Sequence, residues 1–168
     1  MARRLFALDQ NFPQPIVEVL AEFQEEAELV PVGDIDTGMQ TLDDWEVLLA
    51  LHHHEREWDG LITTDSSMLS LPKELSVLMQ TRLTLVVAKE SGHDPLRATG
   101  LLFAYLPGIC ARTHPGESQP WTLRAAQPPE LDPWEHVDRL AKRRGHSAKA
   151  LYESSKLSRT ELKRDPLD

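Results

Sequence analysis

The sequence has a single cysteine, no long apolar run and fewer basic than acidic residues. Its 168 residues include only Cys110, so an internal disulfide cannot form. No apolar run approaches the roughly 20 residues that cross a bilayer, and no apolar segment follows a basic start. We therefore expect neither a membrane span nor a signal peptide, and the composition favours the reducing cytoplasm.

Basic residues are scarce in the first two thirds of the chain. Residues 1–108 hold 7 Lys and Arg against 18 Asp and Glu, whereas residues 109–168 hold 11 against 9. A net charge of −9 argues against a protein that binds nucleic acid chiefly by covering phosphates with cations. The basic tail after His136 would contact a phosphate backbone, the acidic body or a partner chain. Its basic residues are Arg139, Lys142, Arg143, Arg144, Lys149, Lys156, Arg159, Lys163 and Arg164.

Short apolar runs alternate with amphipathic segments as far as Leu106. This alternation predicts βαβ units, and hence an α/β fold with a mainly parallel sheet of about four to five strands and helices on both faces. Pro31 cannot donate to a strand ladder, so its strand is expected at an edge. The expected strands are residues 5–8, 29–32, 60–64 and 83–88, and the expected helices begin at residues 15, 41, 72 and 95.

The sequence changes character after Pro107, where prolines become frequent. We divide the chain into a domain of residues 1–112 and an extension of residues 113–168, which combines a Pro-rich connector with a basic helical tail. Asp132 is expected to cap a helix that Gly145 ends, and a second helix is expected after Ser147. Residues 121–123 lie between prolines and are expected to be extended.

Two of the predicted strands are followed by an aspartate. Asp9 follows residues 5–8, and Asp65 follows residues 60–64. Neighbouring parallel strands end at the same edge of a sheet, where α/β proteins bind their ligands. Asp43, Asp44 and Glu46 fall in the first turn of the helix expected to begin at residue 41. Hard cations such as Mg²⁺ and Mn²⁺ take oxygen ligands, and such an ion would relieve the repulsion among these carboxylates.

Each of these carboxylates also has a structural explanation. Asp44 would cap Thr41 and interact with the helix dipole, and Asp43 has the same alternative. Asp9 and Asp65 would be ordinary turn residues after strands. Asp59 precedes its strand, at the opposite edge of the sheet, and is interpreted as a turn residue.

Three segments, taken in order, resemble the PIN-like nuclease superfamily, especially its small bacterial Mut7-C and DUF5615-like branch. They are residues 9–11 (Asp-Gln-Asn), 43–48 (Asp-Asp-Trp-Glu-Val-Leu) and 63–68 (Thr-Thr-Asp-Ser-Ser-Met). The resemblance implies a three-layer PIN-like fold and a Mg²⁺- or Mn²⁺-dependent ribonuclease, similar to the VapC toxins of toxin–antitoxin pairs. RNA would then be the substrate, and an antitoxin protein would be a partner. Formation of a homodimer is a further possibility.

The resemblance also implies roles for individual residues. Asp9, Asp44 and Asp65 would bind the metal and act in catalysis, with Glu46 as a further ligand. Gln10 and Ser67 stand where the family has acids, which would lower metal affinity. The supporting residues would be Asn11, Thr63, Ser67 and Asp43.

Two other classes of function stay open. Asp9, with Lys89 after a later strand, also suits phosphoryl transfer through an aspartyl phosphate. The substitutions at Gln10 and Ser67 suit a non-catalytic PIN-like module whose acidic cleft has decayed and whose tail mediates assembly. Trp121 and Trp134, near the basic tail, would stack on bases or pack the tail onto the body.

Overall fold

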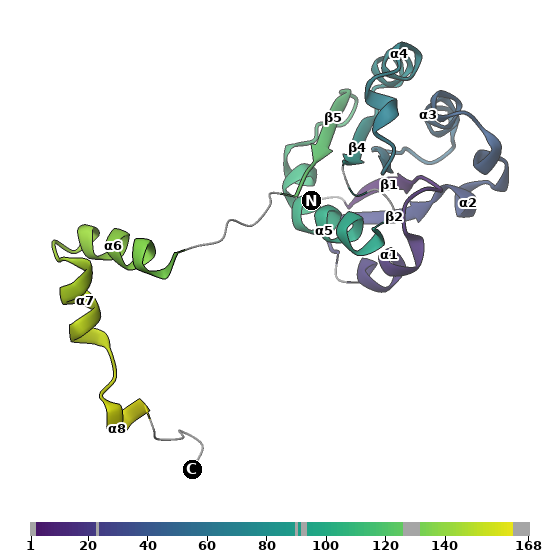
Figure 1. Ribbon diagram of the computed structural model, residues 1–168. Coiled ribbons are helices and arrows are strands. Elements are labelled where there is room, and N and C mark those ends of the chain that lie inside the picture. Colours follow the sequence, from purple (N-terminus) through teal and green to yellow (C-terminus); the bar gives the residue numbers. More distant parts are fainter. Residues whose placement is uncertain (1–2, 23, 90, 92–93, 126–131, 163–168) are drawn as a thin grey trace. The chain divides into compact units, whose positions relative to one another are not determined.

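The structure is a computed structural model that describes residues 3–22, 24–89, 91, 94–125 and 132–162. The chain divides into two compact units, Met1–Ala125 and Ala126–Asp168 (Figure 1). The first unit therefore continues beyond residue 112, where the sequence placed the domain boundary. The reason is that residues 119–123 form a strand that joins the sheet. Lys163 and Arg164 of the basic tail lie outside the described residues.

Five parallel strands form the sheet of the first unit, in the order β2-β1-β3-β4-β5. Their bounds are β1 Arg4–Leu8, β2 Ala27–Pro31, β3 Gly60–Thr63, β4 Thr84–Ala88 and β5 Gln119–Leu123. The expected α/β class and parallel sheet are thus confirmed. Pro31 lies in an edge strand, as its missing N–H group predicts, and Pro120 lies in the other edge strand.

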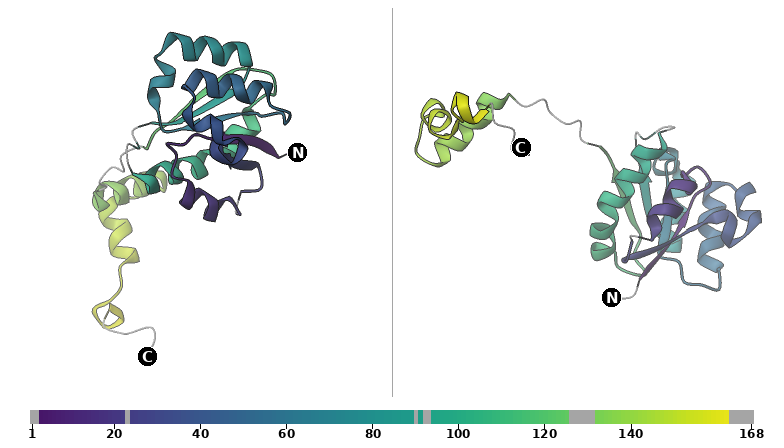
Figure 2. Two further views of the ribbon diagram at one scale, coloured as in Figure 1. Left: turned by 90° about the vertical axis from the view of Figure 1, so that its right-hand side faces the viewer. Right: turned by 90° about the horizontal axis from the view of Figure 1, so that it is seen from below.

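Helices cover both faces of the sheet and give the unit three layers (Figures 1 and 2). The pleat of the strands divides the core accordingly, because successive side chains point to opposite faces. Phe6 of β1 packs with Leu102 on one face, and Ala7 packs with Leu48 on the other. The first face is covered by α1 (Gln14–Ala21) and α5 (Pro95–Arg112), and the second by α3 (Asp44–His53) and α4 (Pro72–Thr81).

The helix expected to begin at Thr41 begins at Asp44 instead. Before it lie α2 (Val32–Ile35) and the 3₁₀ helix η1 (Thr37–Thr41), and the Thr41 hydroxyl donates to the Gly38 carbonyl oxygen. Asp43 is the N-cap residue, and its N–H donates to Glu46 Oε2 at 2.9 Å. Two capping patterns competed in the sequence, and the one with a glutamate at the third helical position formed, because that side chain reaches back to the N-cap N–H.

The helix expected to begin at residue 95 does not stop at Leu106, where the alternating pattern ends in the sequence, because α5 continues through Pro107 to Arg112. A proline inside a helix costs about 3 kcal/mol, since it removes one backbone hydrogen bond. Ile109 and Cys110 are both buried and extend the apolar face of the helix. Burying two such side chains offsets that cost.

The order of the strands creates a switch point between β1 and β3. The chain leaves β1 through α1, on one face of the sheet, to reach β2, and it returns through α3, on the other face, to reach β3. Such a reversal opens a crevice at the carboxyl ends of the two central strands. The Asp9 N–H donates to the Ile62 carbonyl oxygen at 2.9 Å, so Asp9 and Asp65 follow neighbouring strands at this edge, as expected.

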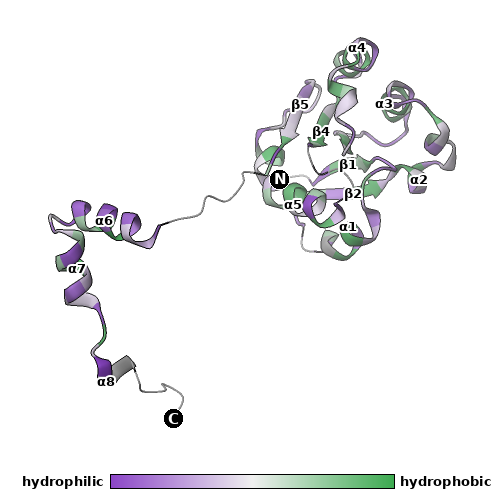
Figure 3. Cartoon of the chain, in the orientation of Figure 1, coloured by the Kyte–Doolittle hydropathy of each residue, from purple (hydrophilic) through white to green (hydrophobic). Residues whose placement is uncertain are grey.

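The second unit consists of α6 (Pro133–Arg143), α7 (Ala148–Ser155) and α8 (Arg159–Leu162). The Asp132 carboxylate accepts the Trp134 N–H, the Ser147 hydroxyl accepts the Ala150 N–H, and Gly145 follows α6 with a φ of +71°. Both helices predicted for this region are thereby confirmed. Figure 3 shows that hydrophilic residues predominate on α6 and α7. Within the described ranges, every helix is too short or too polar to cross a bilayer.

Candidate functional site

Asp9 is the first residue after β1, and it is buried, with 5% of its surface exposed. Its Oδ2 atom accepts hydrogen bonds from Thr63 Oγ1 at 2.7 Å and from Asn11 Nδ2 at 3.4 Å. Burial raises the pKa of Asp9, while the bonds from Thr63, the Gln10 backbone and Asn11 oppose the rise and the charge of Asp65 adds to it. The carboxylate is thus fixed in position, but its charge is poorly solvated.

Thr63 connects Asp9 to Asp65. It is the last residue of β3 and is fully buried, and its hydroxyl accepts the Asp65 N–H at 2.9 Å while donating to Asp9. Asp65 in turn caps the 3₁₀ helix η2 (Ser66–Leu69), since its Oδ1 accepts the Ser67 N–H at 2.7 Å. Ser67 therefore supports Asp65 through its main chain. These hydrogen bonds join the carboxyl ends of β1 and β3 at the switch point.

Asp44 is the first residue of α3 and is partly buried. Burial raises its pKa, and the negative charges of Asp9, Asp65, Glu74 and Asp43 raise it further, in that order. Such mutual effects require that the carboxylates lie close to one another. The structure therefore brings Asp44, from α3, into the electrostatic environment of Asp9 and Asp65. These are the three aspartates that the sequence singled out.

Asp43 and Glu46 have a structural task at the start of α3. Because Glu46 Oε2 accepts the N–H of Asp43, one carboxylate oxygen of Glu46 is already used in the cap. Asn11 is exposed and donates to Asp9 through its side-chain amide. The structure thus separates a group of three aspartates from two acids that stabilise the helix start.

Glu74 is an acid near this site that sequence reasoning did not single out. It lies in the first turn of α4, which packs beside α3, and its charge raises the pKa of Asp44. An acid after Pro72 is common at a helix start because it interacts favourably with the helix dipole. The sequence around Glu74 therefore indicates a helix start and gives no sign of a functional site. Only the packing of α4 against α3 reveals the proximity of Glu74 to Asp44.

The fit of a metal ion depends on how many protein ligands the site must supply. Among the described residues, no group of three or more His, Cys, Asp or Glu side chains is arranged so that it could hold a metal ion. Mg²⁺ usually binds through one or two carboxylates and keeps several waters, so it does not need such a group. The burial of Asp9 and the repulsion between Asp9, Asp44 and Asp65 are both relieved by a dication. Asp9 and Asp65, which are joined through Thr63, supply two carboxylates, the number with which a partly hydrated Mg²⁺ ion is usually bound.

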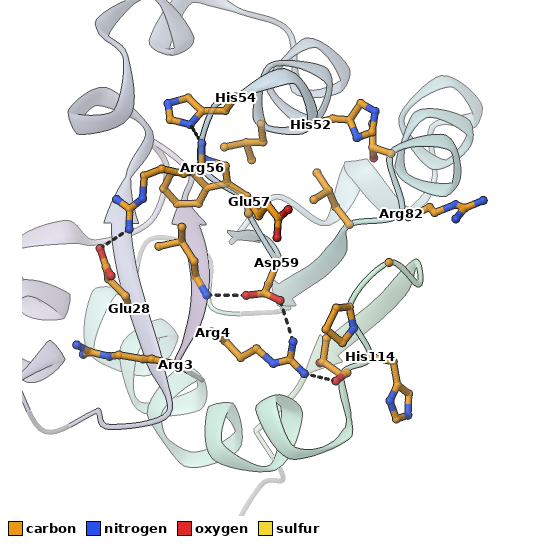
Figure 4. Close-up of a pocket in the computed structure, with 18 residues that line it drawn as sticks. Arg3, Arg4, Glu28, His52, His54, Arg56, Glu57, Asp59, Arg82 and His114 are labelled. Carbon is orange, nitrogen blue, oxygen red and sulfur yellow. Dashed lines mark hydrogen bonds and ion pairs between the residues drawn. The ribbon is translucent and has the colours of Figure 1, made fainter. Parts of the chain in front are cut away.

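A pocket of about 660 Å³ lies at the opposite, amino-terminal edge of the sheet (Figure 4). Here Asp59 accepts hydrogen bonds from Arg4 Nη1 at 3.0 Å and from the Leu5 N–H at 2.8 Å, while Arg4 Nη2 donates to the Thr113 carbonyl oxygen at 2.6 Å. Asp59 is thus at the expected edge, but it does more than form a turn. It links the starts of β1 and β3 to the residue after α5, and its charge is matched by Arg4.

Comparison of the chain with protein-family models, with curated proteins and with solved structures found no match.

Proposed function

We propose that this protein is a PIN-like, Mg²⁺- or Mn²⁺-dependent endoribonuclease. The observation that supports this function is the pair of aspartates, Asp9 and Asp65, that Thr63 joins at the switch point of a parallel sheet, with charges that raise the pKa of Asp44 at the start of α3. A divalent cation would relieve the repulsion among these carboxylates and compensate the poorly solvated charge of Asp9. Phosphodiester hydrolysis is the reaction that such carboxylate-bound ions commonly serve.

The residues of the chain would divide the work as follows. Asp9 would present a carboxylate oxygen held in place by Thr63 and Asn11, and Asp65 would present the oxygen that does not accept the Ser67 N–H. Asp44, at the start of α3, would add a third negative charge near the cation. A divalent cation bound there would lower the pKa of a water and neutralise charge developing on the phosphate.

RNA cleavage tests this function directly. Purified protein is incubated with labelled single-stranded and structured RNA in Mg²⁺, in Mn²⁺ and in EDTA, beside the variant Asp65→Asn. We expect cleavage by the wild type with either metal, and none in EDTA or with the variant. Cleavage that persists in EDTA or in Asp65→Asn would rule out the proposed mechanism.

The wider role is part of the same proposal. We propose that the enzyme acts as the toxin of a toxin–antitoxin pair in the cytoplasm, with an antitoxin protein as its partner and a homodimer as a further assembly. Growth arrest on expression of the wild type, relieved by Asp65→Asn, is the expected result. Equal arrest by both proteins would contradict the toxin role.

One observation favours a second candidate function, a non-catalytic binding module. Among the residues that the structure describes, no group of three or more His, Cys, Asp or Glu side chains could hold a metal ion. Titration with Mn²⁺ separates the two functions, because an ion that binds the folded state raises the melting temperature. The absence of any shift, together with the absence of cleavage, would favour the binding module.

A further inference from the structure

The charges of the two units differ in a way that bears on how a polyanion would bind. Residues 1–125 hold 9 Lys and Arg against 19 Asp and Glu. Residues 139–152, in the second unit, hold five Lys and Arg and no acid. The net negative charge of the first unit would repel the phosphates of RNA, and binding to a phosphate backbone depends on basic side chains. The second unit as a whole, residues 126–168, holds 9 Lys and Arg against 8 Asp and Glu, so its positive charge is concentrated in residues 139–152.

The outer face of α6 presents two of these cations in a line. Arg139 and Arg143 are four residues apart, so they lie on the same face, about 6 Å apart along the helix axis. Both are exposed. Among the described residues of this unit, the ion pairs are Lys142 with Asp138 and Lys156 with Glu153, so neither arginine has a carboxylate partner there. We call Arg139 and Arg143 the basic stripe.

The opposite face of α6 is used for packing within the unit. Trp134 contacts Tyr152 of α7, with ring centroids 4.9 Å apart, and Ala141 is fully buried. At 100° per residue, Arg139 and Arg143 lie about 140° and 180° around the helix from Trp134. Trp134 thus holds the two helices together. The basic stripe points away from this contact and is left for a ligand.

We propose that the basic stripe binds the phosphates of single-stranded RNA and retains the substrate on an otherwise acidic protein. The spacing of the two arginines by one helical turn suits successive phosphates of an extended strand, and a guanidinium donates two parallel hydrogen bonds to a phosphate. This inference rests on the proposed ribonuclease function and names the element that engages its substrate. It needs no metal, so it is testable apart from cleavage.

The test is equilibrium binding of the full-length chain to a fluorescent single-stranded RNA in EDTA, at several salt concentrations. The variant Arg139→Gln/Arg143→Gln removes the stripe, and glutamine keeps the helix propensity. The control Lys142→Gln/Lys156→Gln removes the same charge from the same unit, at residues already paired with acids. Circular dichroism confirms that both variants keep their helices.

We expect the stripe variant to bind RNA about tenfold more weakly than the wild type near 0.1 M salt, and the control to stay within about twofold. The slope of log affinity against log salt should fall by about 1.4 in the stripe variant, because two phosphate contacts are lost. Equal losses in both variants, unchanged binding in the stripe variant, or a wild type that binds no RNA would each overturn the inference. Binding that depends on the stripe, without cleavage in Mn²⁺, would instead count against the nuclease function alone.

Discussion

Thr63 Oγ1 donates a hydrogen bond of 2.7 Å to Asp9 Oδ2, from the last residue of β3 to the first residue after β1. The same hydroxyl accepts the Asp65 N–H, so one buried side chain fixes the positions of two aspartates from different strands. Both aspartates repel Asp44, which approaches from α3. The two aspartates therefore belong to one connected arrangement at this edge of the sheet and not to two independent turns.

Replacing Thr63 by valine should therefore weaken both the fold and the site. The variant keeps the shape of the side chain but leaves the buried Asp9 oxygen and the Asp65 N–H without this partner. We expect a loss of about 1–3 kcal/mol in the free energy of unfolding, measured with urea. Thr64→Val is the matched control, because its hydroxyl makes a longer, exposed bond of 3.3 Å to the Asn11 carbonyl oxygen. Equal losses from the two variants would contradict the role of Thr63.

Asp9 should make the metal-free protein less stable at neutral pH than in mild acid. Burial raises the folded-state pKa of Asp9 above the ordinary value of 3.8, so the unfolded chain ionises first as the pH rises. The contribution of Asp9 to stability is therefore complete below that value and is lost as the pH rises through the folded-state pKa. Asp44, whose pKa is also raised, changes stability in the same direction.

Asp9→Asn tests this sign. Asparagine is still able to accept the Thr63 hydrogen bond, but it carries no charge. In EDTA near pH 7, we expect the variant to be more stable than the wild type by urea denaturation, with the difference shrinking towards pH 4. A variant that is less stable than the wild type at neutral pH would show that the Asp9 charge does not destabilise the metal-free protein.

Substitutions of Glu46, at the start of α3, test whether this acid stabilises the helix by accepting the Asp43 N–H. Glu46→Gln should retain the cap, because a glutamine oxygen also accepts the Asp43 N–H, whereas Glu46→Ala should lose about 1 kcal/mol of stability. Thermal unfolding in EDTA measures the difference. Identical stabilities of the Gln and Ala variants would mean that the bond between Asp43 and Glu46 contributes nothing.

The amino-terminal edge of the sheet should depend on the ion pair of Arg4 with Asp59. Both side chains are largely buried, with 16% and 17% exposed, and Asp59 also accepts the Leu5 N–H. Asp59→Ala leaves Arg4 and the Leu5 N–H unpaired, so we expect a loss of about 2–4 kcal/mol in the free energy of unfolding. The more exposed pair of Arg56 and Glu28 is the control, and Glu28→Ala should cost less than about 1 kcal/mol. A similar cost for the two variants would contradict the role of Asp59.

Much of this architecture follows from local patterns in the sequence. The apolar runs before Asp9 and Asp65 are short and bounded by turn-forming residues, so their strands, and the shared edge at which they end, were predictable. Pro31 identified an edge strand because it lacks an N–H group. Asp132 and Ser147 identified two helix starts, since each side chain caps its helix locally.

The features that the sequence did not reveal depend on contacts between distant segments. The continuation of α5 past Pro107 depends on the burial of Ile109 and Cys110 in the tertiary core. Residues 121–123 were expected to be extended, and β5 confirms this, but only the pairing of residues 119–123 with β4 shows that they join the sheet and moves the boundary of the first unit to Ala125. Glu74 reaches the site through the packing of two helices, which no local pattern records.

Calorimetric titration of the metal-free protein with Mn²⁺ near pH 7 most directly tests the claim that Asp9, Asp44 and Asp65 hold a divalent cation. We predict saturable binding that releases protons and raises the melting temperature, by an amount that corresponds to about 2.7 kcal/mol when free Mn²⁺ is 100-fold above its dissociation constant. Asp9→Asn and Asp44→Asn should abolish both effects, and Glu46→Gln should retain them. No saturable binding by the wild type, or unchanged binding by Asp44→Asn, would contradict the account.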